Sequence, residues 1–196
     1  MNKALNLILN QFANRFENAT LKGVMFWFFL FVISLNISAQ TRLPNFTGID
    51  LNGKKINFSK SFEGRKTLVG FAFSAKVQSD LESWFEPVFY ELIDTNSLAS
   101  MVYDADVYLV ICFNKTNVSF KQKLRNELEE NVLPELYANV VLTEADAGQI
   151  SSELGIRDKS VPHLYTLSKS GIITYATSGV YSEKKFEKLT ALLEID

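Results

Sequence analysis

Few residues of this sequence are suited to catalysis, because the 196-residue chain has one cysteine, Cys112, and one histidine, His163. A single thiol cannot form a disulfide within the chain, which excludes the paired-cysteine (CxxC) chemistry of thiol exchange. Zinc sites built from clustered cysteines or from several histidines are excluded in the same way. The acidic residues Glu144, Asp146 and Glu153 are expected on a solvated face. We therefore assign no catalytic residue and expect no metal site and no cofactor.

Cys112 lies within the apolar run VYLVICF. Free cysteine is among the most buried residue types, and burial in apolar surroundings raises the pKa of the thiol. We therefore expect a structural side chain. The alternative is a reactive thiol, which would make the protein a thiol-disulfide oxidoreductase or a peroxidase-like enzyme that uses Cys112 alone.

Lys76 and Ser79 lie in FAFSAKVQSD, residues 71–80, between an apolar run and an amphipathic one. A serine beside a lysine can act as nucleophile and base. The simpler interpretation makes Ser79 the N-cap of a helix, in a capping box with Glu82, and Lys76 a solvated loop residue.

Hydrophobic periodicity and turn residues predict the elements that must position these groups. Asn52-Gly53 between two alternating runs predicts a hairpin in which both turn residues have positive φ. Pro87 lies inside a predicted helix and should kink it. The expected elements, in chain order, are a hairpin of 46–51 and 54–59, a buried strand 67–74, a helix 81–92, a buried strand 105–113, a helix 119–133, a strand 138–143, a helix that ends near Leu154, a hairpin of 163–168 and 172–178, and a helix from Ser182 to Leu193.

This order of elements predicts an α/β sandwich. The near-continuous apolar strands 67–74 and 105–113 suit the middle of a parallel sheet, where both faces are buried. We expect these two strands to be adjacent and parallel, with the hairpin of 163–178 antiparallel at one side.

Two segments resemble the thioredoxin-like superfamily, over roughly residues 44–196. LPNFTGIDLNGKKINF is similar to the opening hairpin of exported thiol oxidoreductases and peroxiredoxins, and LGIRDKSVPHLYTLSKSGIITYATSG is similar to their segment with a cis-proline and a hairpin glycine. The resemblance implies a thioredoxin-like three-layer sandwich with a central mixed sheet and an N-terminal β-hairpin. It also implies a cis bond between Val161 and Pro162, beside the active-site corner.

The active-site cysteines of that superfamily are absent from this sequence. Aligning FAFS with the corresponding segment places Lys76 and Ser79 at the two cysteine positions, and aligning Pro87 with the superfamily's helix proline places Ser79 and Glu82 there. Neither alignment supplies a sulfur. Because thiol exchange and peroxide reduction both need a thiolate, we expect a redox-inactive member of the superfamily.

One branch of the superfamily, the mitochondrial ATP-synthase assembly chaperones, also lacks the cysteine pair. SWFEPVF, residues 83–89, resembles the helix that follows their first core strand, and LYTLSKSGIITYATSG resembles their tail. This second resemblance implies a role as a chaperone-like assembly factor.

Residues 23–39, GVMFWFFLFVISLNISA, form an apolar run of 17 residues, short of the roughly 20 residues of a spanning helix. Lys22 before the run, the small residue Ala39 at its end and the polar residues after it are typical of a signal peptide. We expect residues 1–40 to be a signal peptide, or alternatively an N-terminal anchor, and residues 41–196 to be the thioredoxin-like domain. The domain is then exported to the periplasm or cell envelope; the mitochondrial inner membrane is the less favoured location.

The resemblance places a binding groove between Lys76 and Ser79 on one side and Val161, Pro162 and His163 on the other. In active relatives the backbone before the cis-proline pairs with an extended peptide, a form of strand addition that needs no cysteine. We therefore expect a binding or assembly factor with a protein or peptide partner in the envelope. His163 either edges this groove or packs as an ordinary strand residue.

Other classes of partner are not indicated. The net charge is −2, and we find no basic stripe with interleaved aromatic residues, so we expect no nucleic-acid partner. Membrane contact is expected only if residues 1–40 are retained.

Overall fold

The structure is a computed structural model that describes residues 41–58, 64–74, 77–94, 96–98, 100–113 and 118–195. All of them belong to one compact unit of the chain, Gln40–Asp196. The predicted signal peptide or anchor and the candidate groove residue Lys76 lie outside the described residues.

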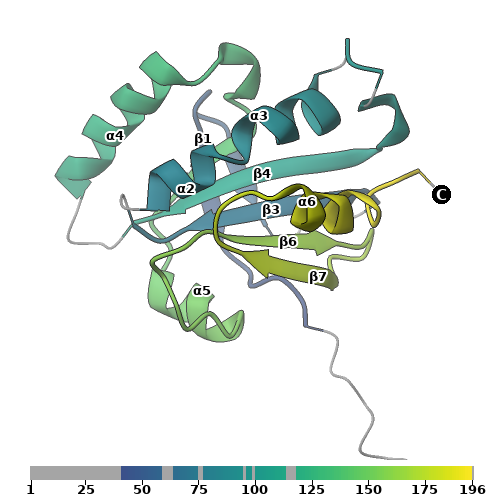
Figure 1. Cartoon of the computed structure of the whole chain (residues 1–196). Coiled ribbons are helices and arrows are strands. Elements are labelled where there is room, and N and C mark those ends of the chain that lie inside the picture. Colours follow the sequence, from purple (N-terminus) through teal and green to yellow (C-terminus); the bar gives the residue numbers. More distant parts are fainter. Residues whose placement is uncertain are drawn as a thin grey trace, which may run out of the picture. The chain divides into compact units, whose positions relative to one another are not determined.

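The described strands form one seven-stranded mixed sheet (Figure 1). Its two central parallel strands, β3 and β4, are adjacent, as the apolar runs predict. The β6–β7 hairpin continues the sheet antiparallel to β3, which is also as predicted. In spatial order the strands are β2 (Lys55–Asn57), β1 (Thr47–Asp50), β5 (Val140–Thr143), β4 (Ala105–Cys112), β3 (Lys66–Ala72), β6 (His163–Leu167) and β7 (Ile173–Ser178).

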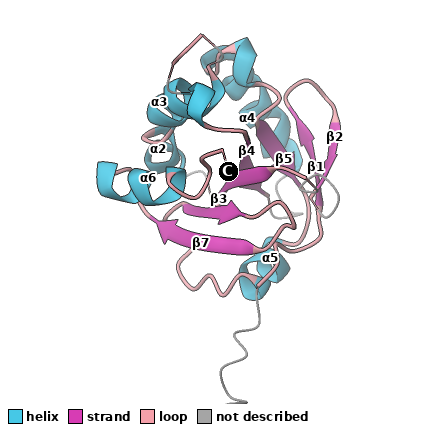
Figure 2. Cartoon of the chain, turned by 90° about the vertical axis from the view of Figure 1, so that its right-hand side faces the viewer, coloured by secondary structure: helices cyan, strands magenta, loops and turns pink. Residues whose placement is uncertain are grey.

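Helices cover both faces of the sheet, so the predicted three-layer α/β sandwich is confirmed (Figure 2). One face carries α5 and the chain that enters and leaves the N-terminal hairpin. The opposite face carries the remaining helices. The helices are α2 (Gln78–Glu82), α3 (Phe85–Val88), the π-helix η2 (Phe89–Ile93), the short 3₁₀ turns η3 (Ser100–Val102) and η5 (Pro134–Leu136), α4 (Val118–Asn131), α5 (Ala147–Glu153) and α6 (Glu183–Thr190).

The N-terminal hairpin forms as predicted, but its turn differs from the prediction. Gly53 has a φ of +82°, whereas Asn52 does not have positive φ. The loop is longer than two residues, because the N–H of Asp50 donates to the C=O of Lys54 and the Asp50 carboxylate accepts from the Lys54 N–H at 2.8 Å. The carboxylate of the buried Asp50 thus stabilises this longer turn, which needs positive φ at Gly53 but not at Asn52.

Gly48 lets strand β1 approach β5 closely. A Cβ added there would lie 2.3 Å from Val141 Cγ1 and 3.1 Å from the Leu142 carbonyl oxygen. We expect Gly48→Ala to lower the free energy of unfolding by about 1–3 kcal/mol, because Val141 is fully buried and cannot move aside. Denaturant unfolding measures the loss.

A double variant provides the control for this prediction. Gly48→Ala combined with Val141→Ala removes the clashing methyl, so the two losses should be less than additive. Unchanged stability in Gly48→Ala would contradict the pairing of the hairpin with β5.

The helix predicted over 81–92 is divided into α2, α3 and η2. The break lies at Ser83–Trp84, and Pro87 is the third residue of α3. Proline has no N–H to donate to the carbonyl one turn earlier, which is the carbonyl of Ser83. The predicted kink is therefore confirmed, and it takes the form of a break four residues before the proline.

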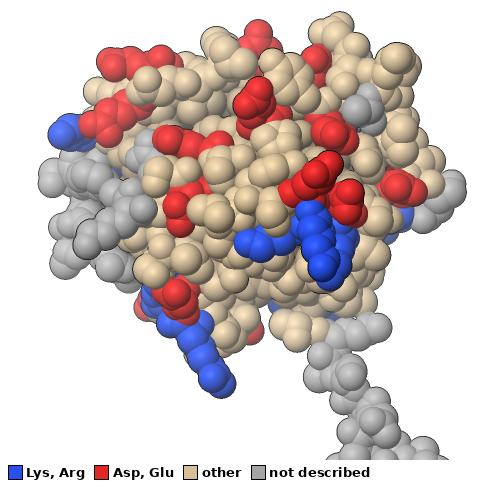
Figure 3. Space-filling model, in the orientation of Figure 1, with Lys and Arg blue, Asp and Glu red and all other residues tan. Residues whose placement is uncertain are grey.

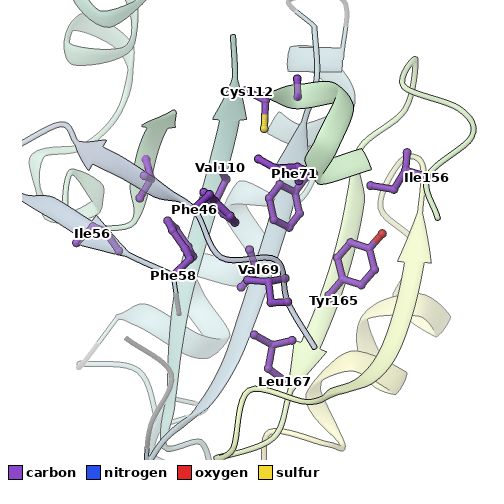
Figure 4. Packing of buried hydrophobic residues seen from close by; sticks show 14 residues of the cluster. Phe46, Ile56, Phe58, Val69, Phe71, Val110, Cys112, Ile156, Tyr165 and Leu167 are labelled. Atoms are coloured by element: carbon purple, nitrogen blue, oxygen red, sulfur yellow. The ribbon is translucent and has the colours of Figure 1, made fainter. Parts of the chain in front are cut away.

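The largest core cluster fills the space between the sheet and α5 (Figure 4). Phe46 stacks on Phe58 at 4.2 Å between ring centroids, and Phe71 meets Tyr165 edge-on at 6.0 Å. These rings come from the segments before β1 and after β2 and from two sheet strands. The core therefore fixes the N-terminal hairpin to the sheet and closes the face on which Cys112 lies.

Candidate functional site

Two loops meet at the end of the sheet where β3 finishes and β6 begins. The register pairs Phe71 with His163, so the residues after Ala72 leave the sheet beside the residues before His163. The N–H of Val77 donates to the C=O of Ser74, and α2 begins at the next residue, Gln78. Ser79 lies on α2, and Val161, Pro162 and His163 lie on the other segment, so all four belong to this end of the sheet, which we call the β3–β6 corner (Figure 1).

Ser79 does not cap α2, and that prediction is wrong. The helix begins one residue before Ser79, and its N-cap is Val77, which makes no side-chain cap bond. Ser79 is exposed in the first turn, and its C=O accepts from the Ser83 N–H at 3.2 Å. Among the described residues, no side chain forms a hydrogen bond with Ser79 Oγ. No described residue therefore activates the hydroxyl as a nucleophile, and Lys76 lies outside the described residues.

The Val161–Pro162 bond is trans, so the predicted cis bond is wrong; the described chain contains no cis peptide. The trans form is the ordinary preference of an X–Pro bond, by about 0.5–1 kcal/mol. The C=O of Pro162 accepts from the N–H of Gly179 at 2.9 Å, which places Pro162 beside the end of β7. Among the described residues, none forms a hydrogen bond with the backbone N–H or C=O of Val161.

The loop before Val161 is held in shape by its own hydrogen bonds. Asp158 Oδ1 accepts from the N–H of Ser160 at 2.8 Å and from its hydroxyl at 2.5 Å, and these bonds lower the pKa of Asp158. His163 Nε2 donates to the C=O of Asp158 at 2.6 Å, because a carbonyl oxygen can only accept. His163 therefore positions this loop, and its ring is partly exposed at the corner.

Lys159 and Phe73 form a second contact across the corner. The ammonium lies 5.9 Å from the centroid of the ring, within the range of a cation–π interaction. Such a pair at an exposed site is worth about 0.5–1 kcal/mol. The contact holds the loop before β6 over the residue that follows β3.

Cys112 is buried, as predicted. It lies under α5 in the cluster of Figure 4, and only 4% of its surface is exposed. Burial raises the pKa of the thiol to about 12, and the charge of Lys159 offsets this only in part. The thiol is therefore protonated at neutral pH and sealed from the solvent at the corner.

Trp84 fixes α3 beside this corner, a role that the sequence pattern did not predict. Trp84 is fully buried, its Nε1 donates to the C=O of Gly179 at 3.0 Å, and its ring meets Tyr181 edge-on at 5.4 Å. Ser83 Oγ accepts from the Tyr181 N–H at 3.0 Å. The segment after β7 is thereby joined to the break between α2 and α3.

A second missed role belongs to Asp146, which was expected on a solvated face. Its carboxylate accepts from the N–H groups of Gly148 and Gln149 and caps α5, the helix that covers Cys112. An aspartate directly before a short helical run, four residues ahead of the buried Ile150, is the sequence signal that identifies such a cap.

Charged side chains are unevenly spread over the molecule. On the face shown in Figure 3, acidic groups lie over the region of α3 and α4, and the basic groups are few and separate. This view shows no continuous band of lysine and arginine over the described residues. The absence of a nucleic-acid partner stays a prediction.

Within the described part, no three of His, Cys, Asp and Glu come together as metal ligands, and no helix is long and apolar enough to cross a bilayer.

Comparison with known proteins identifies the fold. No family model and no curated protein matches the sequence. Among solved structures, the pneumococcal exposed lipoprotein thioredoxin Etrx1 of Streptococcus pneumoniae is 18% identical, with a TM-score of 0.53, over 76% of this chain and 100% of its own. A thiol:disulfide interchange protein of Bacteroides sp. is 18% identical, with a TM-score of 0.55, over 80% of this chain and 90% of its own.

A third similar structure belongs to an assembly protein. BsSco, a member of the Sco family of cytochrome c oxidase assembly proteins, is 14% identical, with a TM-score of 0.53, over 81% of this chain and 96% of its own. Likeness at these identities concerns the fold, and the chain has the thioredoxin-like α/β fold that its sequence predicts. These likenesses show the fold alone, and the resemblance to the ATP-synthase assembly branch stays a prediction.

Proposed function

We propose that this protein is a redox-inactive thioredoxin-like binding module, which acts as a chaperone-like assembly factor for a protein partner in the cell envelope. The main observation behind the proposal concerns the hydrogen bonding of the Val161 backbone. Its N–H and C=O have no partner among the described residues, although the flanking Ser160 and Pro162 are both hydrogen-bonded. An extended segment of a partner can satisfy both groups by adding as a strand.

The chemistry of the site supports binding without catalysis. Neither Ser79 nor His163 is arranged with a described base or nucleophile, and the Cys112 thiol is buried and protonated. Solved structures of this fold include thiol:disulfide interchange proteins and an assembly protein, BsSco. We propose an assembly role for this chain by analogy with BsSco.

Export is part of the same proposal. Residues 23–39 and the small residue that ends them are typical of a leader or anchor, and either form leaves residues 41–196 outside the cytoplasm. The partner is then a protein or peptide of the periplasm or envelope.

Selection from a peptide display library on the full-length protein tests the proposal. We expect extended peptides to be recovered, to bind in calorimetric titration, and to shift the amide resonances of Val161 and His163. Pro162→Ala should weaken their binding. Recovery of no peptide above background, or binding that shifts only resonances distant from the corner, would contradict the proposed site.

A further inference from the structure

Exposed apolar side chains gather at the end of the sheet opposite the β3–β6 corner. We call this end the basal pole. It consists of residues 41–42, 64–66, 98, 100–103, 168–171 and 192–195, and it lies where β3 and β4 begin. Met101 is 70% exposed and Ile195 is 59% exposed, and Leu98, Val102 and Leu192 are also exposed. A cluster of such residues marks an interaction surface.

Two segments carry this apolar surface and are joined by backbone contacts. The N–H of Ile195 donates to the C=O of Val102 at 3.1 Å, and Tyr103 and Glu194 form a β-bridge. Lys66 Nζ donates to the C=O of Glu194 at 2.7 Å, which fixes the C-terminal tail to the start of β3. In Figure 1, this end of the sheet is the one nearest the marked C-terminus.

The chain that follows the apolar run 23–39 reaches the molecule at this same pole. The C=O of Thr41 accepts from the Ile173 N–H at 2.9 Å, and Arg42 Nη1 donates to the C=O of Ser170 at 3.2 Å. The tip of the β6–β7 hairpin is in turn joined to the start of β3, because the Gly64 N–H donates to the Lys169 C=O.

The length of chain between the apolar run and the pole is very short. Only Gln40 separates Ala39 from Thr41. Since an extended chain spans at most about 3.5 Å per residue, Thr41 lies within about 7 Å of the last apolar residue. A 17-residue run is also shorter than the roughly 20 residues that span a bilayer, and such a mismatch draws flanking residues toward the headgroups.

We propose that the basal pole lies on a lipid bilayer, with residues 23–39 retained as an anchor and with Met101, Val102 and Ile195 in contact with the lipid. The occupant of the apolar surface is then the membrane itself. This orientation directs the β3–β6 corner away from the bilayer, toward partners in the surrounding compartment. The proposal goes beyond the binding function and does not rest on it.

Lipid quenching of a fluorophore on the full-length protein tests the proposal. In a Cys112→Ser background, single cysteines at Met101, Val102 or Ile195 are labelled, and the protein is reconstituted into vesicles of equal parts phosphatidylethanolamine and phosphatidylglycerol. Lipids with brominated acyl chains should remove most of the fluorescence at these positions. Val180→Cys is the matched control, because Val180 is 52% exposed and follows β7 at the opposite end. It should lose almost none.

A second set of variants separates lipid contact from simple tethering. With the probe at Val102, Met101→Glu together with Ile195→Glu should remove most of the quenching, because charged side chains lift the pole from the lipid. Val180→Glu should leave the quenching unchanged. Equal quenching at Val102 and Val180, quenching insensitive to the two glutamates, or a protein from its native host that lacks residues 23–39 would each overturn the proposal.

Discussion

Thiol reagents are expected to modify Cys112 in the native protein at least about a thousandfold more slowly than in the unfolded chain. The pKa of the thiol is raised from 9.0 to about 12 by burial, so the reactive thiolate is about a thousandfold rarer at neutral pH. Burial beneath α5 slows the reagent further. Labelling kinetics with and without denaturant measure the ratio.

An exposed thiol provides the control for this experiment. Val180→Cys in a Cys112→Ser background should react at the rate of a free thiol in the native state, because Val180 is half exposed. Neither the wild type nor Cys112→Ser should reduce insulin disulfides or consume peroxide. Fast native labelling combined with turnover that is lost in Cys112→Ser would establish the rival oxidoreductase.

The raised pKa of Cys112 also makes the free energy of unfolding depend on pH. The unfolded chain releases the Cys112 proton above about pH 9, whereas the folded chain keeps it until about pH 12. The contribution of Cys112 to stability is therefore full below pH 9 and falls as the pH rises through that window. Between pH 8 and pH 10 the wild type should lose about 1.4 kcal/mol more stability than Cys112→Ala. Tyr165, whose pKa burial also raises to about 12, is present in both proteins and cancels. Equal losses would show that the thiol titrates normally.

Trp84→Ala is expected to lower the free energy of unfolding by about 3–5 kcal/mol, the range for removing a large buried aromatic side chain. Trp84 is fully buried between α3, the sheet and α6, and it also donates the hydrogen bond to Gly179. Trp84→Phe keeps most of the ring packing and loses the donor, so it should cost about 1 kcal/mol from the hydrogen bond alone. Denaturant unfolding followed by circular dichroism measures both losses.

Tyr90→Ala is the matched control, because Tyr90 is an aromatic residue of the same helical segment but is half exposed. Its loss should lie within about 0.5 kcal/mol of zero. A Trp84→Ala loss no larger than that of Tyr90→Ala would contradict the packing of α3 against the segment after β7.

Features set by apolar periodicity could be predicted from the sequence. The runs around Leu68 and Val110 are near-continuously apolar and of strand length, which is typical of a strand buried on both faces. The helix α5 ends near Leu154 as predicted, and Gly155 after it has a φ of +67°, a conformation that few other residues adopt. The burial of Cys112 follows from the same periodicity.

Features set by contacts distant in the sequence could not be predicted. The Trp84–Gly179 hydrogen bond joins residues 95 positions apart, and no local pattern reports it. Ser79 has the residue type of a helix cap, but the turn from Ser74 to Val77 starts the helix before it. The resemblance implied a cis bond before Pro162, but the bond is trans. Similar sequences place a proline at this position without determining whether its peptide bond is cis or trans.

The most direct test of the central claim compares peptide binding by Val161→Pro and Val161→Ala in the full-length protein. Proline removes the backbone N–H of Val161 without breaking any hydrogen bond of the described structure, and alanine keeps that N–H. Peptides selected on the wild type should bind Val161→Pro about tenfold more weakly, the value of one hydrogen bond of about 1.4 kcal/mol, and should bind Val161→Ala almost as well as the wild type. Circular dichroism confirms that both variants are folded. Equal affinity of the two variants would contradict strand addition at Val161.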